Sequence, residues 1–146
     1  MSAAQESYPR TTTYRHRVRY LEVDQQGVVF NMWYLGYFDE AMTQHLADGG
    51  LAYLDMIDAG FDVQLVRSEI EWKAPLRWPD DVEVVVTTER TGSTSFTLAF
   101  EVRTGAGTTA ATGRTVYVVI AADGSGKRPI PPVLAAALGL EPGVAL

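Results

Sequence analysis

Hydrophobic and polar positions alternate over residues 12–23. One face carries aromatic, apolar or imidazole side chains, namely Tyr14, His16, Val18 and Tyr20. The other face carries three arginines: Arg15, Arg17 and Arg19. A period of two predicts a β-strand with one buried face. Residues 24–27 (Asp-Gln-Gln-Gly) place Asp first and Gly fourth, which favours a β-turn that ends this strand.

The spacing changes after Asn31, which is suited to cap the start of a helix. Apolar residues then recur at intervals of three and four, as one buried helical stripe requires. They are Leu35, Phe38, Met42 and Leu46. The helix is expected to end near Asp48, because Gly49 and Gly50 follow it. A short helical turn is predicted at residues 51–58.

The second half of the chain predicts four strands separated by turns that carry Pro or Gly. Their ranges are 61–73, 82–91, 95–104 and 109–121. Consecutive strands joined by short turns are expected to be antiparallel neighbours, with the long helix covering one face. The prediction is an α+β fold, a five-stranded antiparallel sheet wrapped around a central helix. A chain of 146 residues suits one domain.

The domain is expected to span residues 13–132, after a disordered leader at 1–12 and before a tail at 133–146 that includes a short helical turn. A sheet covered by one helix leaves its edges and its other face exposed. We therefore expect at least a dimer. A pocket would then form most readily between subunits.

Composition narrows the classes of function. The chain has no Cys, which excludes disulfides and thiolate catalysis, and its net charge of −6 argues against nucleic-acid partners. No apolar run approaches the roughly 20 residues of a membrane span, and no secretory signal is present at the start of the sequence. A cytoplasmic location is the expectation by elimination. His16 and His45 are isolated in the sequence, so neither a metal site nor a cofactor is expected.

Asp24 is the candidate for chemistry that remains. It lies in a turn between the end of a strand and the start of a helix, where unpaired N–H groups and a partial positive charge can polarise a carbonyl. A carboxylate there can attack that carbonyl or activate a water. The structural alternative is that Asp24 only stabilises its turn and Asn31 only caps the helix.

A resemblance strengthens the catalytic interpretation. Residues 20–35, YLEVDQQGVVFNMWYL, resemble the signature of the 4-hydroxybenzoyl-CoA thioesterase family of hot-dog proteins. Three later segments also fit this family: Pro75-Leu76 before Asp80-Asp81, GSTSF at residues 92–96, and RPIP at residues 128–131. The resemblance covers residues 14–132. It implies a hot-dog fold, dimers that often pair into tetramers, and an acyl-CoA thioesterase activity. We accordingly expect a homodimer or homotetramer that needs no cofactor.

The family also implies roles for residues of this chain. Asp24 would be the nucleophile or general base, the backbone N–H near Asn31 would polarise the thioester carbonyl, and Gly27 would let the loop approach closely. Four residues are implied substrate contacts: Phe30, Tyr34, Ser93 and Ser95. Three basic residues are candidates for the CoA arm: Lys127, Arg128 and, more weakly, Arg90. Phe30 and Tyr34 could equally be core aromatics, and the three cations could be solvated surface charges.

Several alternatives stay open. Some relatives carry His at the position of Asn31, so this chain cannot use an imidazole there. The substrate could be a carrier-protein thioester, because the pantetheine arm is shared, and a non-catalytic acyl-binding module is a second alternative. A hydratase on this fold would need a His near the acid, and His45 lies far along the helix. The sequence leaves open the acyl group, the choice between dimer and tetramer, and the pathway.

Overall fold

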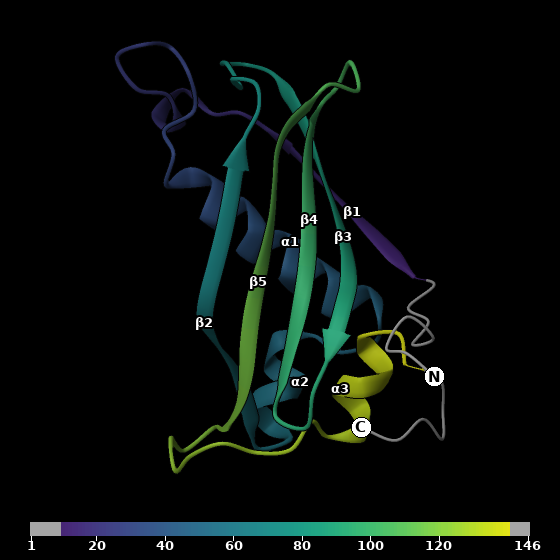
Figure 1. The fold of residues 1–146 in the computed structure, drawn as a ribbon. Coiled ribbons are helices and arrows are strands. Elements are labelled where there is room, and N and C mark those ends of the chain that lie inside the picture. Colours follow the sequence, from purple (N-terminus) through teal and green to yellow (C-terminus); the bar gives the residue numbers. More distant parts are fainter. Residues whose placement is uncertain (1–9, 141–146) are drawn as a thin grey trace.

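A computed structural model describes residues 10–140, and in this range a five-stranded sheet wraps around one long helix (Figure 1). The strands are β1 (Thr11–Arg17), β2 (Phe61–Trp72), β3 (Asp81–Thr91), β4 (Ser95–Thr104) and β5 (Thr109–Ala121). The helices are α1 (Trp33–Asp48), α2 (Tyr53–Asp58), α3 (Pro132–Ala137) and the single 3-10 turn η2 (Tyr20–Glu22). The predicted α+β fold, a central helix within an antiparallel sheet, is confirmed.

The strands lie in the order β1-β3-β4-β5-β2. The expectation that consecutive strands are neighbours is correct for β3–β4 and β4–β5 but wrong for β2 and β3, because β2 pairs with β5 at the opposite edge. Residues 73–80 therefore cross the end of the sheet from the edge strand β2, past β5 and β4, to β3, which lies inside the other edge strand β1 (Figure 1). This crossing brings the segment against the residues that precede α1.

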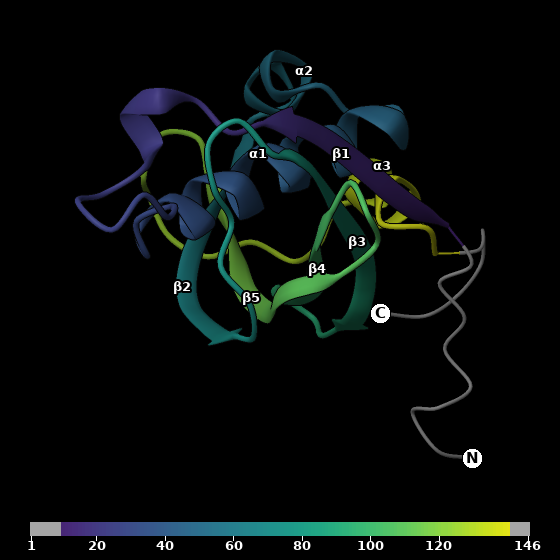
Figure 2. The ribbon, with the colours of Figure 1, turned by 90° about the horizontal axis from the view of Figure 1, so that it is seen from above.

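The sheet curves around α1, which lies in its concave side (Figure 2). The buried positions on α1 are Tyr34, Tyr37, Phe38, Ala41, Met42, His45 and Leu46. The predicted stripe is right for Phe38, Met42 and Leu46, but Leu35 is 39% exposed. The buried arc is wider than the predicted stripe because the curved sheet contacts the helix from several sides.

Two local predictions need correction. The first strand ends at Arg17 rather than Val23, because the chain turns into η2 and Val18 N–H donates to the Asp80 carbonyl. Asn31 does not cap α1 with its side chain. Met32 is at the N-cap position, and the backbone carbonyls of Phe30, Asn31 and Met32 accept the first N–H groups.

The ends of the described range are part of the fold. Thr11 and Thr12 belong to β1, although they fall within the expected leader. The expected tail contains α3, which buries Leu134 and Ala137 in the core. Residues 1–9 and 141–146 lie outside the described residues, so the rest of the predicted leader and tail stays a prediction. Among residues 10–140, no helix combines the length and apolarity needed to cross a membrane.

Candidate active site

Asp24 lies in a tight turn, and its own hydrogen bonds are all to residues of that turn. Its N–H donates to the Val28 carbonyl and its carbonyl accepts from Gly27 N–H, both at 2.9 Å. One carboxylate oxygen, Oδ1, accepts the backbone N–H of Gln26 at 2.8 Å. Gly27 has φ 77°, in the left-handed region that glycine adopts without strain. The turn holds the half-buried Asp24 carboxylate by one oxygen and leaves Oδ2 without a partner among the described residues.

The crossing segment fixes this turn from outside. Val29 N–H donates to the Leu76 carbonyl at 2.8 Å, and Val28 forms a bridge with Arg77. Residues 73–80 reach the turn only because β2 pairs with β5 and not with β3, so that the chain must cross the sheet. This strand pairing, which the order of strands in the sequence did not predict, therefore anchors the turn.

The start of α1 offers free donors beside the turn. Within residues 10–140, no acceptor is found for the backbone N–H of Asn31 or Met32. These amides lie at the positive end of a 16-residue helix, where a developing oxyanion is stabilised. The Asn31 side chain is exposed, and Phe30 is 44% exposed. A carboxylate and unpaired N–H groups thus occur within one short segment, a combination suited to acyl transfer.

Tyr34 is a core residue in this chain. It is 2% exposed and meets Trp72 edge to face, with ring centroids 6.1 Å apart. Burial raises the pKa of the Tyr34 phenol, so the group stays neutral at physiological pH. Trp72, 49% exposed, covers Tyr34 from solvent and is the more accessible of the two rings.

The remaining candidates for contacts with the substrate and the CoA arm lie away from Asp24. Ser93 accepts Ile130 N–H through its carbonyl, Ser95 pairs with Val118, and Arg128 N–H donates to the Val119 carbonyl. These contacts unite the β3–β4 turn with the segment after β5, at the end of the sheet opposite the loop before α1 (Figure 1). Lys127 and Arg128 are exposed there. Arg90 instead adjoins the outer sheet face with Arg67 and Arg114.

The structure therefore brings the sequence-predicted residues into two groups and does not join them within one chain. Five lie at or near the start of α1: Asp24, Gly27, Phe30, Asn31 and Tyr34. Four lie at the opposite end: Ser93, Ser95, Lys127 and Arg128.

Sequence reasoning missed a buried acid next to the turn. Glu22 is 1% exposed, and its carboxylate accepts hydrogen bonds from His16 Nε2 (2.9 Å), Tyr37 Oη (2.8 Å), Arg19 N–H (2.9 Å) and Arg19 Nε (3.0 Å). Burial alone would raise the pKa of Glu22, but these donors outweigh it and hold the pKa below its ordinary value. Burial and the bond to Glu22 raise the pKa of Tyr37. Glu22 continues the alternation that places His16 and Val18 on one face, but the strand ends at Arg17 and Tyr20 of the same face is 75% exposed, so alternation did not indicate that Glu22 is buried.

The other histidine belongs to a separate buried network. Thr88 donates its hydroxyl proton to the Leu138 carbonyl at 2.8 Å, so its oxygen accepts from His45 Nε2 at 3.0 Å. His45 Nδ1 is then the acceptor, and it receives the Thr12 hydroxyl at 2.8 Å. His45 is thus a neutral structural residue. Within residues 10–140, no group of His and acidic side chains is placed to hold a metal ion.

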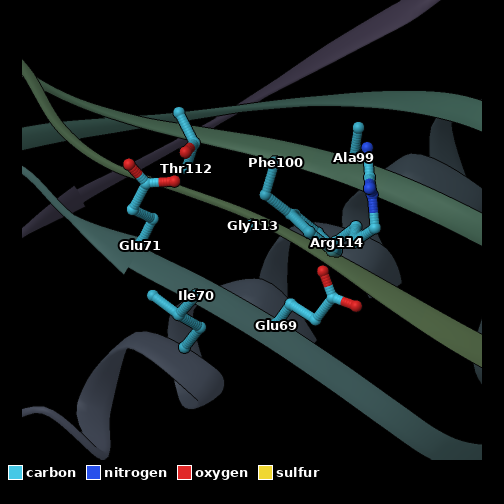
Figure 3. Close-up of a pocket in the computed structure, with 8 residues that line it drawn as sticks. All are labelled: Glu69, Ile70, Glu71, Ala99, Phe100, Thr112, Gly113 and Arg114. Carbon is cyan, nitrogen blue, oxygen red and sulfur yellow. The ribbon is translucent and has the colours of Figure 1, made fainter.

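Two hollows differ sharply in character. The larger, about 500 Å³, lies on the sheet beside Ala99 and Gly113 and is bordered by charged side chains, including Glu69, Glu71 and Arg114 (Figure 3). The other, about 210 Å³, lies between α1, α2 and β2. Its walls are mainly apolar, with Met42, Leu46, Leu51, Met56 and Val63, and acidic residues Asp39 and Asp62 also line it. Of these two hollows, the second has the lining that suits an apolar acyl group.

Comparisons with known proteins identify the class. A protein of Aquifex aeolicus named as an esterase is 37% identical over 87 residues, which are 60% of this chain and 68% of that protein. The crystal structure of a 1,4-dihydroxy-2-naphthoyl-CoA thioesterase from Synechocystis superposes with a TM-score of 0.81 at 26% identity, covering 88% of this chain and 96% of the other. A gentisyl-coenzyme A thioesterase gives 0.79 at 26% identity, covering 87% and 99%.

The fold is therefore that of the hot-dog thioester hydrolases, and the protein is an enzyme of this class. The family model of the Thioesterase-like superfamily matches residues 18–138, and the chain belongs to that superfamily.

Proposed function

We propose that this enzyme hydrolyses the thioester of an acyl-CoA or aroyl-CoA, with Asp24 as nucleophile or general base, as in the 4-hydroxybenzoyl-CoA thioesterases that its motif resembles. The observation that carries the proposal is the Asp24 carboxylate, with Oδ2 unbonded among the described residues, in the segment that also supplies the unpaired N–H groups of Asn31 and Met32.

In the general-base form, Asp24 takes a proton from water as the water oxygen bonds to the thioester carbon. The N–H groups of Asn31 and Met32 stabilise the resulting oxyanion. Collapse of the tetrahedral intermediate breaks the C–S bond and expels the CoA thiolate, which takes the proton back from Asp24. In the nucleophilic form, the carboxylate adds to the thioester carbon, and collapse of the adduct breaks the C–S bond, expels the CoA thiolate and leaves a mixed anhydride. Water then hydrolyses the anhydride to the free acid and the Asp24 carboxylate, and the proton released is taken up by the thiolate.

A second copy of the chain would complete the site. The candidates for the CoA arm and the apolar hollow are not beside Asp24 of the same chain. Strand β2 is an edge of the sheet, and its Leu65 and Val66 side chains are 46% and 54% exposed. Antiparallel pairing of β2 with its counterpart would set the start of one α1 beside the opposite end of the partner chain. This arrangement is our proposal for how the CoA arm and the acyl group reach Asp24.

The acyl group would enter the hollow between α1, α2 and β2. Its volume of about 210 Å³ suits one or two aromatic rings or a short to medium alkyl chain. The Synechocystis thioesterase and the gentisyl-coenzyme A thioesterase are named for aromatic acyl groups, which supports an aroyl substrate here as well.

The test is thiol release from short, medium, long and aromatic acyl-CoAs, followed with a thiol-reactive chromophore. We expect turnover of at least one substrate by the wild type and a loss of about 1000-fold or more in Asp24→Asn. Asp123→Asn is the matched control, because Asp123 Oδ1 accepts Ser125 N–H at 2.8 Å in the same kind of turn. Turnover of Asp24→Asn near the wild-type rate would overturn the role of Asp24. If only carrier-protein thioesters are hydrolysed, the substrate is a carrier-protein thioester and not an acyl-CoA. If acyl-CoA is bound without hydrolysis, the protein is a non-catalytic acyl-binding module.

A further inference from the structure

The buried carboxylate of Glu22 has no part in the chemistry proposed above, yet its environment is costly to build. An ionised carboxylate removed from water is strongly destabilising unless hydrogen bonds replace its hydration. Glu22 is 1% exposed and accepts all four of the donors described above, at 2.8–3.0 Å. A core position that needed only packing would be filled more cheaply by an apolar side chain.

These donors come from three parts of the chain that meet at this point. His16 belongs to β1, Arg19 to the segment after it, and Tyr37 to the second turn of α1. The rings of His16 and Tyr37 also touch, with centroids 4.8 Å apart, and the Arg19 guanidinium lies 5.9 Å from the Trp33 ring centroid. The carboxylate therefore ties the first half of α1 to the end of β1.

The main chain of Glu22 carries this connection to Asp24. The Glu22 carbonyl accepts Phe30 N–H at 2.9 Å, Val23 forms a bridge with Val29, and Asp24 N–H reaches the Val28 carbonyl. Glu22 and Phe30 are thus the last hydrogen-bonded pair at the base of the turn that carries Asp24. The residue after Phe30 is Asn31, whose N–H has no acceptor within residues 10–140.

We propose that Glu22 is a positioning residue: its carboxylate fixes the base of the Asp24 turn against α1, so that the Asp24 carboxylate and the Asn31 and Met32 amides keep one relative geometry. This inference rests on the proposed function. A displacement of about 1 Å between reacting groups can cost about 100-fold in rate, so loss of this anchor is expected to lower kcat far more than it alters KM.

The first test is Glu22→Gln, which keeps the shape of the side chain but places an amide N–H₂ against donors. We expect kcat to fall by about 10- to 100-fold with KM changed by less than about threefold. Tyr37→Phe removes one donor and keeps the ring, so it gives a smaller fall in the same direction even if Glu22→Gln folds poorly. The control is Thr88→Val, which breaks the separate buried network of His45 and Leu138 and is expected to lower stability without lowering kcat.

A double-mutant cycle separates positioning from a general loss of structure. If Glu22 acts through Asp24, then Glu22→Gln costs nothing further in the Asp24→Asn background. Multiplicative losses, or an equal fall of kcat in Thr88→Val, would show a merely structural role and overturn the proposal.

Hydrogen exchange gives a readout that does not need activity. In Glu22→Gln, the amides of Asp24, Val29 and Phe30 should exchange faster, while those of β4 and β5 should not. Unchanged exchange in the turn would contradict the inference whatever the substrate is. Failure of the proposed function shows instead as wild-type protein without turnover, or as an active Asp24→Asn variant, and leaves this measurement valid.

Discussion

Phe38 of α1 stacks on Phe100 of β4, with ring centroids 4.3 Å apart and planes 5° from parallel. The Phe38 ring also lies against the backbone of Gly113 in β5, where a Cβ atom would fall 2.6 Å from Cε2 of Phe38. The central helix can pack this closely on the sheet because Gly113 of β5 has no side chain. This contact lies midway along the sheet, where it sets the distance between helix and strands.

Gly113→Ala is expected to destabilise the protein. The added Cβ would lie 2.6 Å from both the Phe38 ring and the Glu69 carbonyl, so either the ring or the strand must shift. Overpacking of this kind costs about 1–3 kcal/mol in free energy of unfolding. Urea denaturation measures it. Gly107→Ala is a loop control with open space at the Cβ position but a left-handed φ of 90°, which reports backbone strain alone. A Gly113→Ala variant as stable as the wild type would contradict the prediction.

Stability is expected to fall as the pH drops from about 6.5 to about 4, through His45. Burial, and then the nearby Arg10 guanidinium, lower the pKa of His45 from 6.5 to about 4. The unfolded chain therefore binds a proton in this window that the folded chain does not, so stability present above pH 6.5 is lost on acidification. The difference in pKa corresponds to about 3 kcal/mol at most.

Thermal denaturation at a series of pH values checks this expectation. His45→Gln should be less stable than the wild type at pH 7.5 but should lose most of the slope between pH 6.5 and 4.5. Several carboxylates with lowered pKa, including Glu22 and Glu101, contribute only at lower pH. An unchanged slope in His45→Gln would assign the acid sensitivity to another group.

Lys127 and Arg128 are expected to bind the phosphates of CoA. Alanine at either position should raise KM for an acyl-CoA roughly tenfold and leave kcat nearly unchanged, because an exposed cation binds the ground and transition states alike. N-acetylcysteamine thioesters carry the same acyl group without phosphates, and their KM should not change. Arg103→Ala is a control for surface charge, since Arg103 forms an ion pair with Glu101. Equal effects on both substrates would exclude phosphate binding.

Assembly through β2 is expected to be necessary for activity. Val66→Glu adds a charge to the exposed edge strand, where it would oppose pairing with a second copy. Light scattering after gel filtration should give a dimer or tetramer for the wild type and a smaller species for the variant, with a parallel loss of turnover at low protein concentration. Val133→Glu, at an apolar position on α3 that is 44% exposed, against 54% for Val66, is the control. A fully active monomer would contradict the two-chain site.

Much of the fold and part of the site could be predicted from the sequence. The period of two over the strands and the spacing of Phe38, Met42 and Leu46 are local consequences of how each element is buried on one side. The turn at Asp24 follows in the same way, since Asp and Gly in their places favour it regardless of distant contacts. Local physics thus located the candidate carboxylate and the adjoining helix start.

Only the tertiary structure decided how these parts meet. Strand β2 is the hydrogen-bonded neighbour of β5, although β3 and β4 lie between them in the sequence, so nearness in sequence does not govern that pairing. The burial of Glu22 does not follow from nearness in sequence either, since its donors come from separate elements. The sequence also indicates Asp24 and Lys127 as candidate site residues, but it does not indicate that they lie at opposite ends of the sheet. The pairing of strands that are distant in the sequence determines where Asp24 and Lys127 lie. That pairing depends on packing summed over the whole chain, so no local sequence pattern encodes it.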